Sequence, residues 1–178
     1  ATAMTGAEWR LQVERRSGEH WTGAVWLGEV TSGFEVNDLG YSRSSERLDG
    51  GARVSYREIT PGPIFRDYSL SLWTFHNWRH EALDDVWSAS AWGRAHKSGS
   101  LMLNGRGTLN NFWGGSIGVT YSPEVLDDAA TRGGPLMVSP ARIGTDARLY
   151  TDRRRAISVN ASLGYDWGAG GRALNAGV

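Results

Sequence analysis

The sequence predicts an all-β fold: an antiparallel, up-and-down segment of a transmembrane β-barrel, with about eight strands that form part of a larger barrel. Three observations lead to this prediction. Apolar and polar residues alternate with a period of two along most of the chain. The alternating segments reach about ten residues, the length that a tilted strand needs to cross a bilayer, whereas strands of soluble proteins average about five or six. Aromatic residues gather at the ends of these segments, on the apolar side.

The first predicted strands are 9–16, 20–27 and 47–57, with a tight turn at Ser17-Gly18-Glu19. In strand 9–16, Trp9, Leu11 and Val13 share one face, and charged or polar residues share the other. Strand 47–57 has the clearest pattern, because small and apolar residues occupy its even positions and charged or polar residues most of its odd ones. Such alternation is typical of a strand with two different environments.

The segment Pro61-Gly62-Pro63 interrupts the pairing of strands, since proline cannot donate a backbone hydrogen bond. The fourth predicted strand starts at Tyr68. In segment 87–109 small or apolar residues occupy mostly odd positions and polar residues mostly even positions, without a break. This pattern predicts one very long strand or two strands joined by a turn at 97–99. The remaining strands are 113–121, 143–150 and 157–167, and residues 168–178 are predicted to be a loop or a frayed end. No segment has a convincing helical period, and residues 1–178 are predicted to form a single partial barrel domain.

Composition excludes several classes of protein. Hydrophobic residues make up 40% of the 178 residues, but no run approaches the roughly 20 apolar residues of a membrane-spanning helix. Nineteen basic residues balance nineteen acidic ones, so the charge gives no reason to expect nucleic acid as a partner. The absence of cysteine excludes disulfides and thiolate metal sites. No signal peptide is visible at the start, so we expect it to have been removed, or the chain to begin within a longer protein.

Alternation alone is also compatible with a soluble β-sandwich, in which the apolar face is the core. The membrane interpretation is favoured by aromatic residues at strand ends, where interfacial girdles lie in membrane barrels. These residues, each in step with the apolar positions of its strand, are Trp9, Trp21, Tyr56, Tyr68, Trp113, Tyr121, Tyr165 and Trp167. With eight strands, the two long loops 31–46 and 123–141 fall on the same side of the membrane, as extracellular loops do.

Several segments resemble an uncharacterised family of bacterial outer-membrane proteins, in which a β-barrel follows a family 9-type carbohydrate-binding module. The matching segments, in the family's order, are 33–41, Pro61–Arg66, Asn111–Trp113, Leu126–Asp128 and 131–135. The chain resembles the barrel only, which implies an internal fragment of a larger barrel. The resemblance also implies a location in the bacterial outer membrane, the lipid bilayer as a partner, and surface binding or transport of carbohydrate or another small solute.

The sequence indicates no catalytic residue, cofactor or metal site. The four histidines lie on different segments, and the acidic pairs have no calcium-loop spacing. The candidate ligand-binding residues lie in the long loops: Glu35, Asn37, Asp38, Asp127, Asp128 and Arg132. The candidate lumen-facing residues are Arg53, Arg57, Arg94, Arg106 and Arg148. Two alternatives remain: a soluble carbohydrate-binding β-sandwich, and an outer-membrane hydrolase with its carboxylates on the loops.

Overall fold

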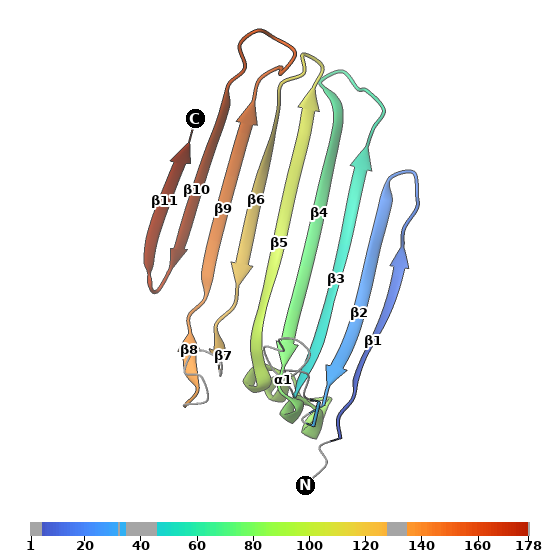
Figure 1. Cartoon of the computed structure of the whole chain (residues 1–178), viewed down its shortest axis with the longest axis vertical. Coiled ribbons are helices and arrows are strands. Elements are labelled where there is room, and N and C mark those ends of the chain that lie inside the picture. Colours follow the sequence, from blue (N-terminus) through green and yellow to red (C-terminus); the bar gives the residue numbers. More distant parts are fainter. Residues whose placement is uncertain (1–4, 32, 35–45, 128–134, 178) are drawn as a thin grey trace.

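A nine-stranded antiparallel sheet dominates the computed structural model, which describes residues 5–31, 33–34, 46–127 and 135–177. The strands stand side by side in the order β1-β2-β3-β4-β5-β6-β9-β10-β11 (Figure 1). They are β1 (Glu8–Arg15), β2 (Trp21–Val30), β3 (Arg47–Glu58), β4 (Phe65–Trp78), β5 (His96–Leu109), β6 (Gly114–Ser122), β9 (Arg142–Tyr150), β10 (Asn160–Gly168) and β11 (Gly171–Gly177). The predicted all-β antiparallel fold is confirmed. The sheet is open, with β1 and β11 as its edges.

The connections at the two ends of the sheet differ in length. Segments 16–20, 59–64, 110–113 and 151–159 join strands at one end, which we call the short-loop end (upper end in Figure 1). Segments 31–46, 79–95 and 123–141 join strands at the other end, the long-loop end, together with the tight β10–β11 turn at 169–170. Loops 31–46 and 123–141 therefore lie at the same end, as expected. Loop 123–141 contains a small hairpin of β7 (Val125–Asp127) and β8 (Met137–Ser139).

The prediction of strand throughout 87–109 is wrong in its first part. Residues Ala89–Ala95 form helix α1, preceded by the 3₁₀ helix η1 (His80–Asp85), and β5 begins only at His96. Ser88 caps α1 by accepting a hydrogen bond from the Ala91 backbone N–H at 3.3 Å. Alanine has the highest helix propensity, and tertiary contacts decide the conformation of such a short segment. The alternation of small and polar residues did not distinguish helix from strand here.

The prediction of a loop or frayed end at 168–178 is also wrong, because Gly171–Gly177 form the edge strand β11. β11 pairs with β10 from Gly168↔Gly171 to Ser162↔Gly177. Gly171 has φ +132°, a conformation that glycine adopts readily and other residues rarely do. The glycine-rich sequence at the start of this segment encodes a tight turn, and the hairpin supplies the ninth strand of the sheet.

Among the described residues, a buried hydrophobic cluster between the sheet and the helices lies at the long-loop end. Leu48 of β3, Ala82 of η1 and Ala95 of α1 form a small buried cluster, against which Trp78 and Trp92 pack. The two indole rings meet edge to face, with centroids 5.2 Å apart. Such aromatic pairs stabilise a fold beyond the area that they bury. None of the helices among the described residues is long and apolar enough to cross a membrane.

Candidate functional site

The strand register places most of the apolar residues of the nine strands on one side of the sheet, which we call the apolar face. One row across it runs through Val54, Leu72, Leu103 and Val119 on the adjacent strands β3 to β6. Its side chains are exposed at both edges and at the centre: Leu11 is 63% exposed, Ile117 62% and Leu174 68%. Over most of its area, therefore, no described segment of the chain covers this face.

Aromatic side chains line the apolar face at both ends. At the short-loop end Trp21, Tyr56 and Tyr68 form a continuous row, with ring centroids 5.0 and 5.9 Å apart. At the long-loop end the register places Trp9, Trp78, Tyr121 and Trp167 near the other ends of their strands. Tyr68 and Trp78 lie at opposite ends of β4, about 33 Å apart at roughly 3.3 Å per residue. Between the two rows this face carries Leu70 and Leu72 of β4 and Leu101 and Leu103 of β5, together with the polar side chains of Thr74 and His76.

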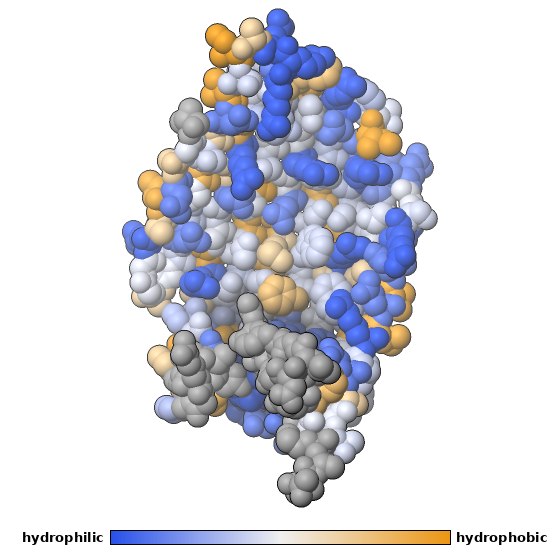
Figure 2. Space-filling view, in the orientation of Figure 1, coloured by the Kyte–Doolittle hydropathy of each residue, from blue (hydrophilic) through white to orange (hydrophobic). Residues whose placement is uncertain are grey.

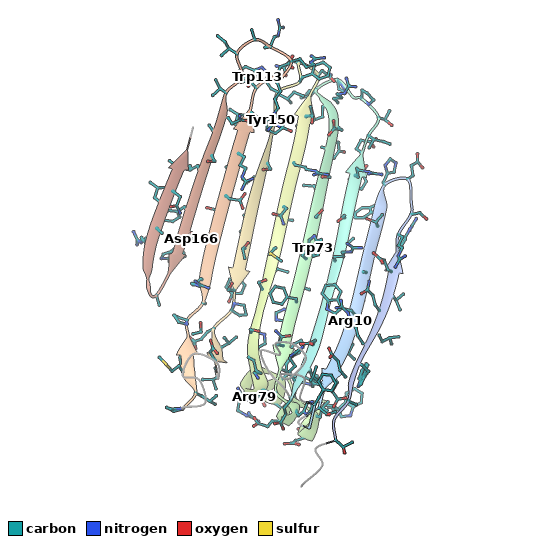
Figure 3. The ribbon with its side chains drawn as sticks, viewed as in Figure 1. Arg10, Trp73, Arg79, Trp113, Tyr150 and Asp166 are labelled. Atoms are coloured by element: carbon teal, nitrogen blue, oxygen red, sulfur yellow. The ribbon has the colours of Figure 1, made fainter. Side chains whose placement is uncertain are left out.

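The opposite side, the polar face, carries ordered pairs of arginine and tryptophan. The guanidinium carbon of Arg10 lies 5.4 Å from the Trp26 ring centroid, and that of Arg53 lies 5.5 Å from the Trp73 ring centroid. These are cation–π contacts, which hold the long arginine side chains against the sheet. Figure 2 shows hydrophilic side chains scattered among residues of intermediate hydropathy over the face in view, and Figure 3 labels Arg10, Trp73 and Asp166.

Small residues let side chains of the polar face reach across neighbouring strands. Arg53 of β3 forms an ion pair with Glu14 of β1 across Ala24, which is directly opposite both in the register. Trp26 likewise lies over Gly51, where a Cβ would come within 2.2 Å of the indole. The alternation of large and small residues thus determines which polar groups meet on this face.

Two hollows open on the polar face over β4 to β10. The first, which we call the central hollow, has a volume of about 350 Å³. Its polar or aromatic lining residues are Ser69, Ser71, Trp73, Asn104, Arg106, Ser116 and Asp146. The second, the lateral hollow, is also about 350 Å³ and is lined by Thr120, Ser122, Arg142, Asp146 and Asp166, among others. Asp146 lines both hollows, which are within the size range of small-molecule sites.

Glycines in or beside the hollows bring polar groups together: Gly144 and Gly164 line the lateral hollow, and Gly118 lies between Asn104 and Asp146 in the register. A Cβ on Gly118 would lie 2.3 Å from a carboxylate oxygen of Asp146 and 3.0 Å from Oδ1 of Asn104. A Cβ on Gly144 would lie 2.8 Å from a carboxylate oxygen of Asp166. The carboxylates therefore lie low over the strands. They leave a surface of hydroxyl, amide and carboxylate groups beside the Trp73 ring, which can hydrogen-bond a polar solute.

The short-loop end is held together around Phe112 and Asp152. The Asp152 carboxylate is buried, with 6% of the residue exposed, and accepts hydrogen bonds from the Nε and Nη2 atoms of Arg154, both at 2.9 Å. These bonds, with a further one from the Arg154 backbone N–H, lower the pKa of Asp152 to about 2. The same pairing raises the pKa of Arg154. The Arg154 guanidinium also lies over the Phe112 ring, 3.2 Å from its centroid.

Arg79 connects the elements of the long-loop end. Its guanidinium donates to the Arg94 carbonyl of α1 at 2.5 Å and to the Leu126 carbonyl of β7 at 3.3 Å. Nearby, the Trp9 indole donates to Glu29 at 2.8 Å, and Glu29 lies 3.3 Å from His80. The helical segment and the β7–β8 hairpin are thus fastened to each other at one rim of the sheet (Figure 3).

His76 and His96 form a pair that sequence spacing did not indicate. Their Nδ1 and Nε2 atoms lie 2.9 Å apart across β4 and β5, and both rings lie against Trp78. Within residues 5–31, 33–34, 46–127 and 135–177, no group of three or more His, Cys, Asp or Glu side chains is arranged to hold a metal ion. A hydrogen-bonded pair that supports the aromatic row is the role consistent with this geometry.

The predicted site residues fall in different parts of the chain. Arg53, Arg57, Arg106 and Arg148 all lie on the polar face, as expected for their parity. Arg94 does not: it belongs to α1 at the long-loop end, because the segment before His96 is helical. Asp127 ends β7. The other candidate ligand-binding residues, Glu35, Asn37, Asp38, Asp128 and Arg132, lie outside the described part of the chain.

Sequence reasoning missed Trp73, Asn104, Asp146 and Asp166 as possible site residues. Of these, Trp73 could have been noticed in the sequence, because it is an aromatic residue on the same side of the strand as the polar residues Ser69 and Ser71. The convergence of Asn104 and Asp146 over Gly118 depends on the pairing of β5, β6 and β9. Strands β6 and β9 are separated by a long loop, so no local pattern reveals it.

Residues 1–172 match the model of a family described as "Domain of unknown function (DUF5916)". No curated protein matches the chain, and no solved structure does.

Proposed function

The chain belongs to the DUF5916 family, and from this premise we propose that it forms part of an outer-membrane β-barrel that binds or passes a small polar solute. The observation that carries the proposal is the apolar face, which extends over nine strands and which no described layer covers except at the long-loop end, where η1 and α1 pack on Leu48 and Trp78. An exposed apolar surface of this extent needs a nonpolar environment, and a monomeric soluble domain rarely has one. Lipid hydrocarbon supplies that environment.

The spacing of the aromatic rows supports a bilayer as that environment. The roughly 33 Å between Tyr68 and Trp78 along β4 becomes about 25 Å along the membrane normal at a strand tilt of about 40°. Membrane barrels have an apolar band of about 25 Å between aromatic girdles. The distribution of short and long loops agrees, with the short-loop end facing the periplasm and the long-loop end facing the outside.

In this arrangement the polar face lines the lumen and the open edges β1 and β11 pair with further strands. Edge strands that expose unpaired backbone groups cannot remain so inside a bilayer. The soluble β-sandwich alternative would require a large second sheet over the apolar face, and the second sheet of residues 5–31, 33–34, 46–127 and 135–177 is the two-stranded β7–β8 hairpin. The hydrolase alternative relies on loop carboxylates that lie mostly outside the described residues.

For the solute, the central hollow favours a neutral polyhydroxylated molecule such as a carbohydrate. It combines the Trp73 ring with the Asn104 amide, the Asp146 carboxylate and serine hydroxyls. A neutral polyol can donate to Asp146 and accept from Asn104 or Arg106 without placing a second charge in the site. Its apolar C–H groups can lie on the indole ring.

The proposal is tested by the electrophoretic mobility of the full-length protein refolded in detergent, with unheated and boiled samples compared. A closed, detergent-resistant barrel migrates differently before and after boiling, and we expect such a shift. Flotation with lipid vesicles in a density gradient is the second readout. A protein that is folded and monomeric in detergent-free buffer, without a heat-dependent shift, contradicts the proposal.

A further inference from the structure

Alternating arginine and serine residues form a row across the polar face near the short-loop end. Each member of the row lies directly opposite the next in the register of adjacent strands. From β3 to β10 this row, which we call the arginine–serine row, consists of Arg57, Ser69, Arg106, Ser116, Arg148 and Ser162. Neighbouring arginines are therefore two strands apart, with their Cα atoms about 10 Å from each other, and a serine lies between them.

The arginines of this row are not neutralised as other arginines of the polar face are. Arg53 forms an ion pair with Glu14, and Arg47 forms one with Asp49. The three arginines of the row are exposed, and none of them forms an ion pair with a carboxylate of the residues that the structure describes. The row is therefore a strip of positive charge that is accessible from the polar face.

The acids nearest to the row do not cancel its charge. Asp146 lies in the next row, two residues before Arg148 on β9 and opposite Gly118. Asp67 lies in the next row towards the short-loop end, where its carboxylate accepts a hydrogen bond from the Thr108 hydroxyl at 3.2 Å. The three guanidinium groups of the row outnumber these two carboxylates, and the row itself contains no acid.

We infer that the arginine–serine row binds the acidic group of an oligosaccharide whose neutral part occupies the central hollow. Two arginines that flank a serine can both reach one carboxylate that lies over it, because their side chains are long. Each guanidinium matches carboxylate oxygens with two parallel hydrogen bonds, and the serine hydroxyl is a further donor. Arginine rings have the corresponding role in anion-selective pores. This inference rests on the proposed function, because it extends the proposed solute site.

The row and the central hollow are one continuous surface, which is why a single solute can use both. Ser69, Arg106 and Ser116 belong to the row and also line the hollow. A free anion would use the arginines alone, and a neutral oligosaccharide would not need their charge. A solute that combines hydroxyl groups with an acidic group uses the whole surface.

The acidic group is expected over Ser69, between Arg57 and Arg106. The Nε atom of Arg106 donates to the Ser69 hydroxyl at 3.1 Å, so this guanidinium already lies on that side. Asp146 belongs to β9, three strands away from Ser69, and does not oppose an anion there. The neutral units then lie on the part of the hollow that contains Asp146, where a second negative charge would be repelled.

The test is isothermal titration calorimetry of the full-length protein in detergent micelles, with two probes that differ in one group. Maltotriose is neutral, and maltotrionate carries a carboxylate in place of the aldehyde at the reducing end. We expect maltotrionate to bind about tenfold more tightly, because its carboxylate accepts hydrogen bonds from charged donors. Raising the salt concentration from about 0.05 M to about 0.5 M should remove most of this preference by screening.

Variants test whether the row is the source of the preference. Arg57→Gln/Arg106→Gln should abolish the preference for maltotrionate, and Arg57→Lys/Arg106→Lys should retain most of it. The matched control is Arg10→Gln/Arg47→Gln, which removes the same charge from the polar face near the long-loop end and should leave the preference unchanged. The readout is the ratio of the two affinities, because Arg106 also lines the central hollow.

Equal affinities of the two probes, or no binding of maltotrionate, overturn the inference. A preference that persists in the Gln double variant, or that the control also loses, overturns it as well. Inorganic phosphate that displaces maltotrionate completely and binds as tightly would assign the row to free anions and overturn the acidic oligosaccharide. A protein that shows the heat-dependent shift and binds maltotriose, but does not prefer maltotrionate, retains the proposed function and loses only this inference.

Discussion

Arg53 of β3 and Glu14 of β1 form an ion pair across the intervening strand β2, over the small side chain of Ala24. Arg53 also contacts the Trp73 ring on its other side, in β4. One side chain therefore links four adjacent strands on the polar face. Because no described segment forms a second layer on this face, such links between neighbouring strands are an important source of the stability of the sheet.

Replacing either residue of this ion pair should destabilise the sheet, and the effects of the two replacements should not be additive. We expect Glu14→Gln and Arg53→Gln each to lower the denaturant midpoint of unfolding in detergent micelles. The double variant should lose less than the sum of the two single losses, since each single change already breaks the pair. As a control, Glu14→Gln combined with Arg148→Gln on the remote strand β9 should be additive. Additivity in the Glu14–Arg53 cycle would show that the pair contributes no coupling.

A charge on the apolar face distinguishes a lipid environment from a water-exposed one. Leu103→Arg, near the middle of β5, should destabilise the membrane-inserted protein by about 2–4 kcal/mol, because arginine is costly near the bilayer midplane. The neighbouring change Met102→Arg places the same charge on the polar face and should cost much less. Unfolding in lipid vesicles by guanidinium chloride measures both. Equal effects of the two variants would contradict the assignment of the faces.

Acidification should loosen the short-loop end through Asp152. Hydrogen bonds from Arg154 lower the pKa of Asp152 in the folded state to about 2, against an ordinary value of about 3.9. Because this pKa is lower in the folded state than in the unfolded state, the ionised Asp152 stabilises the fold at every pH above its unfolded-state pKa. This stabilisation is lost as the pH falls from about 4 to about 2. Protease cleavage in segment 151–159, followed against pH, should rise over that window.

The Asp152→Asn variant is the control for this pH dependence. It should be cleaved faster than the unmodified protein at neutral pH and should lack the acid-dependent rise between about pH 4 and 2. An identical acid-dependent rise in the variant would assign the effect to another group.

Solute binding should depend on the central hollow. With a neutral oligosaccharide such as maltotriose as the probe, Asp146→Asn should weaken binding about tenfold, because it removes a hydrogen bond to a charged group. Trp73→Leu should weaken it and also reduce the fluorescence change on binding. Asn175→Ala, on the polar face of β11 and outside both hollows, should leave affinity unchanged. Equal affinity in all three variants would exclude the central hollow as the binding site.

The strands and their two faces could be predicted from the sequence because the signal is local. In a strand with different environments on its two sides, apolar and polar residues must alternate. The alternation within a segment such as 47–57 therefore predicts both its conformation and its two faces. The prediction failed where local patterns were ambiguous. Ala89–Ala95 alternates like a strand but forms a helix, because alanine and serine fit both conformations and the contacts with Leu48 and Trp78 decide between them.

The candidate site was predicted only in part, for a related reason. Parity placed Arg53, Arg57, Arg106 and Arg148 on the polar face, and the structure agrees. Parity did not indicate which polar groups meet, because that depends on which strands pair and in what register. The approach of the Asp146 and Asn104 side chains to Gly118 requires β6 and β9 to be neighbours, despite the long loop between them.

By itself, then, the sequence determined the strands, the division of their residues between two faces, and the aromatic ends of the apolar one, because each follows from neighbouring positions along one strand. Only the tertiary structure decided the helix at 89–95, the edge strand β11, the hollows and the contacts of Arg66 and Arg154 with Phe112. Each of these depends on contacts between segments far apart in the chain. The free energy of such contacts cannot be inferred from the residue pattern within one segment.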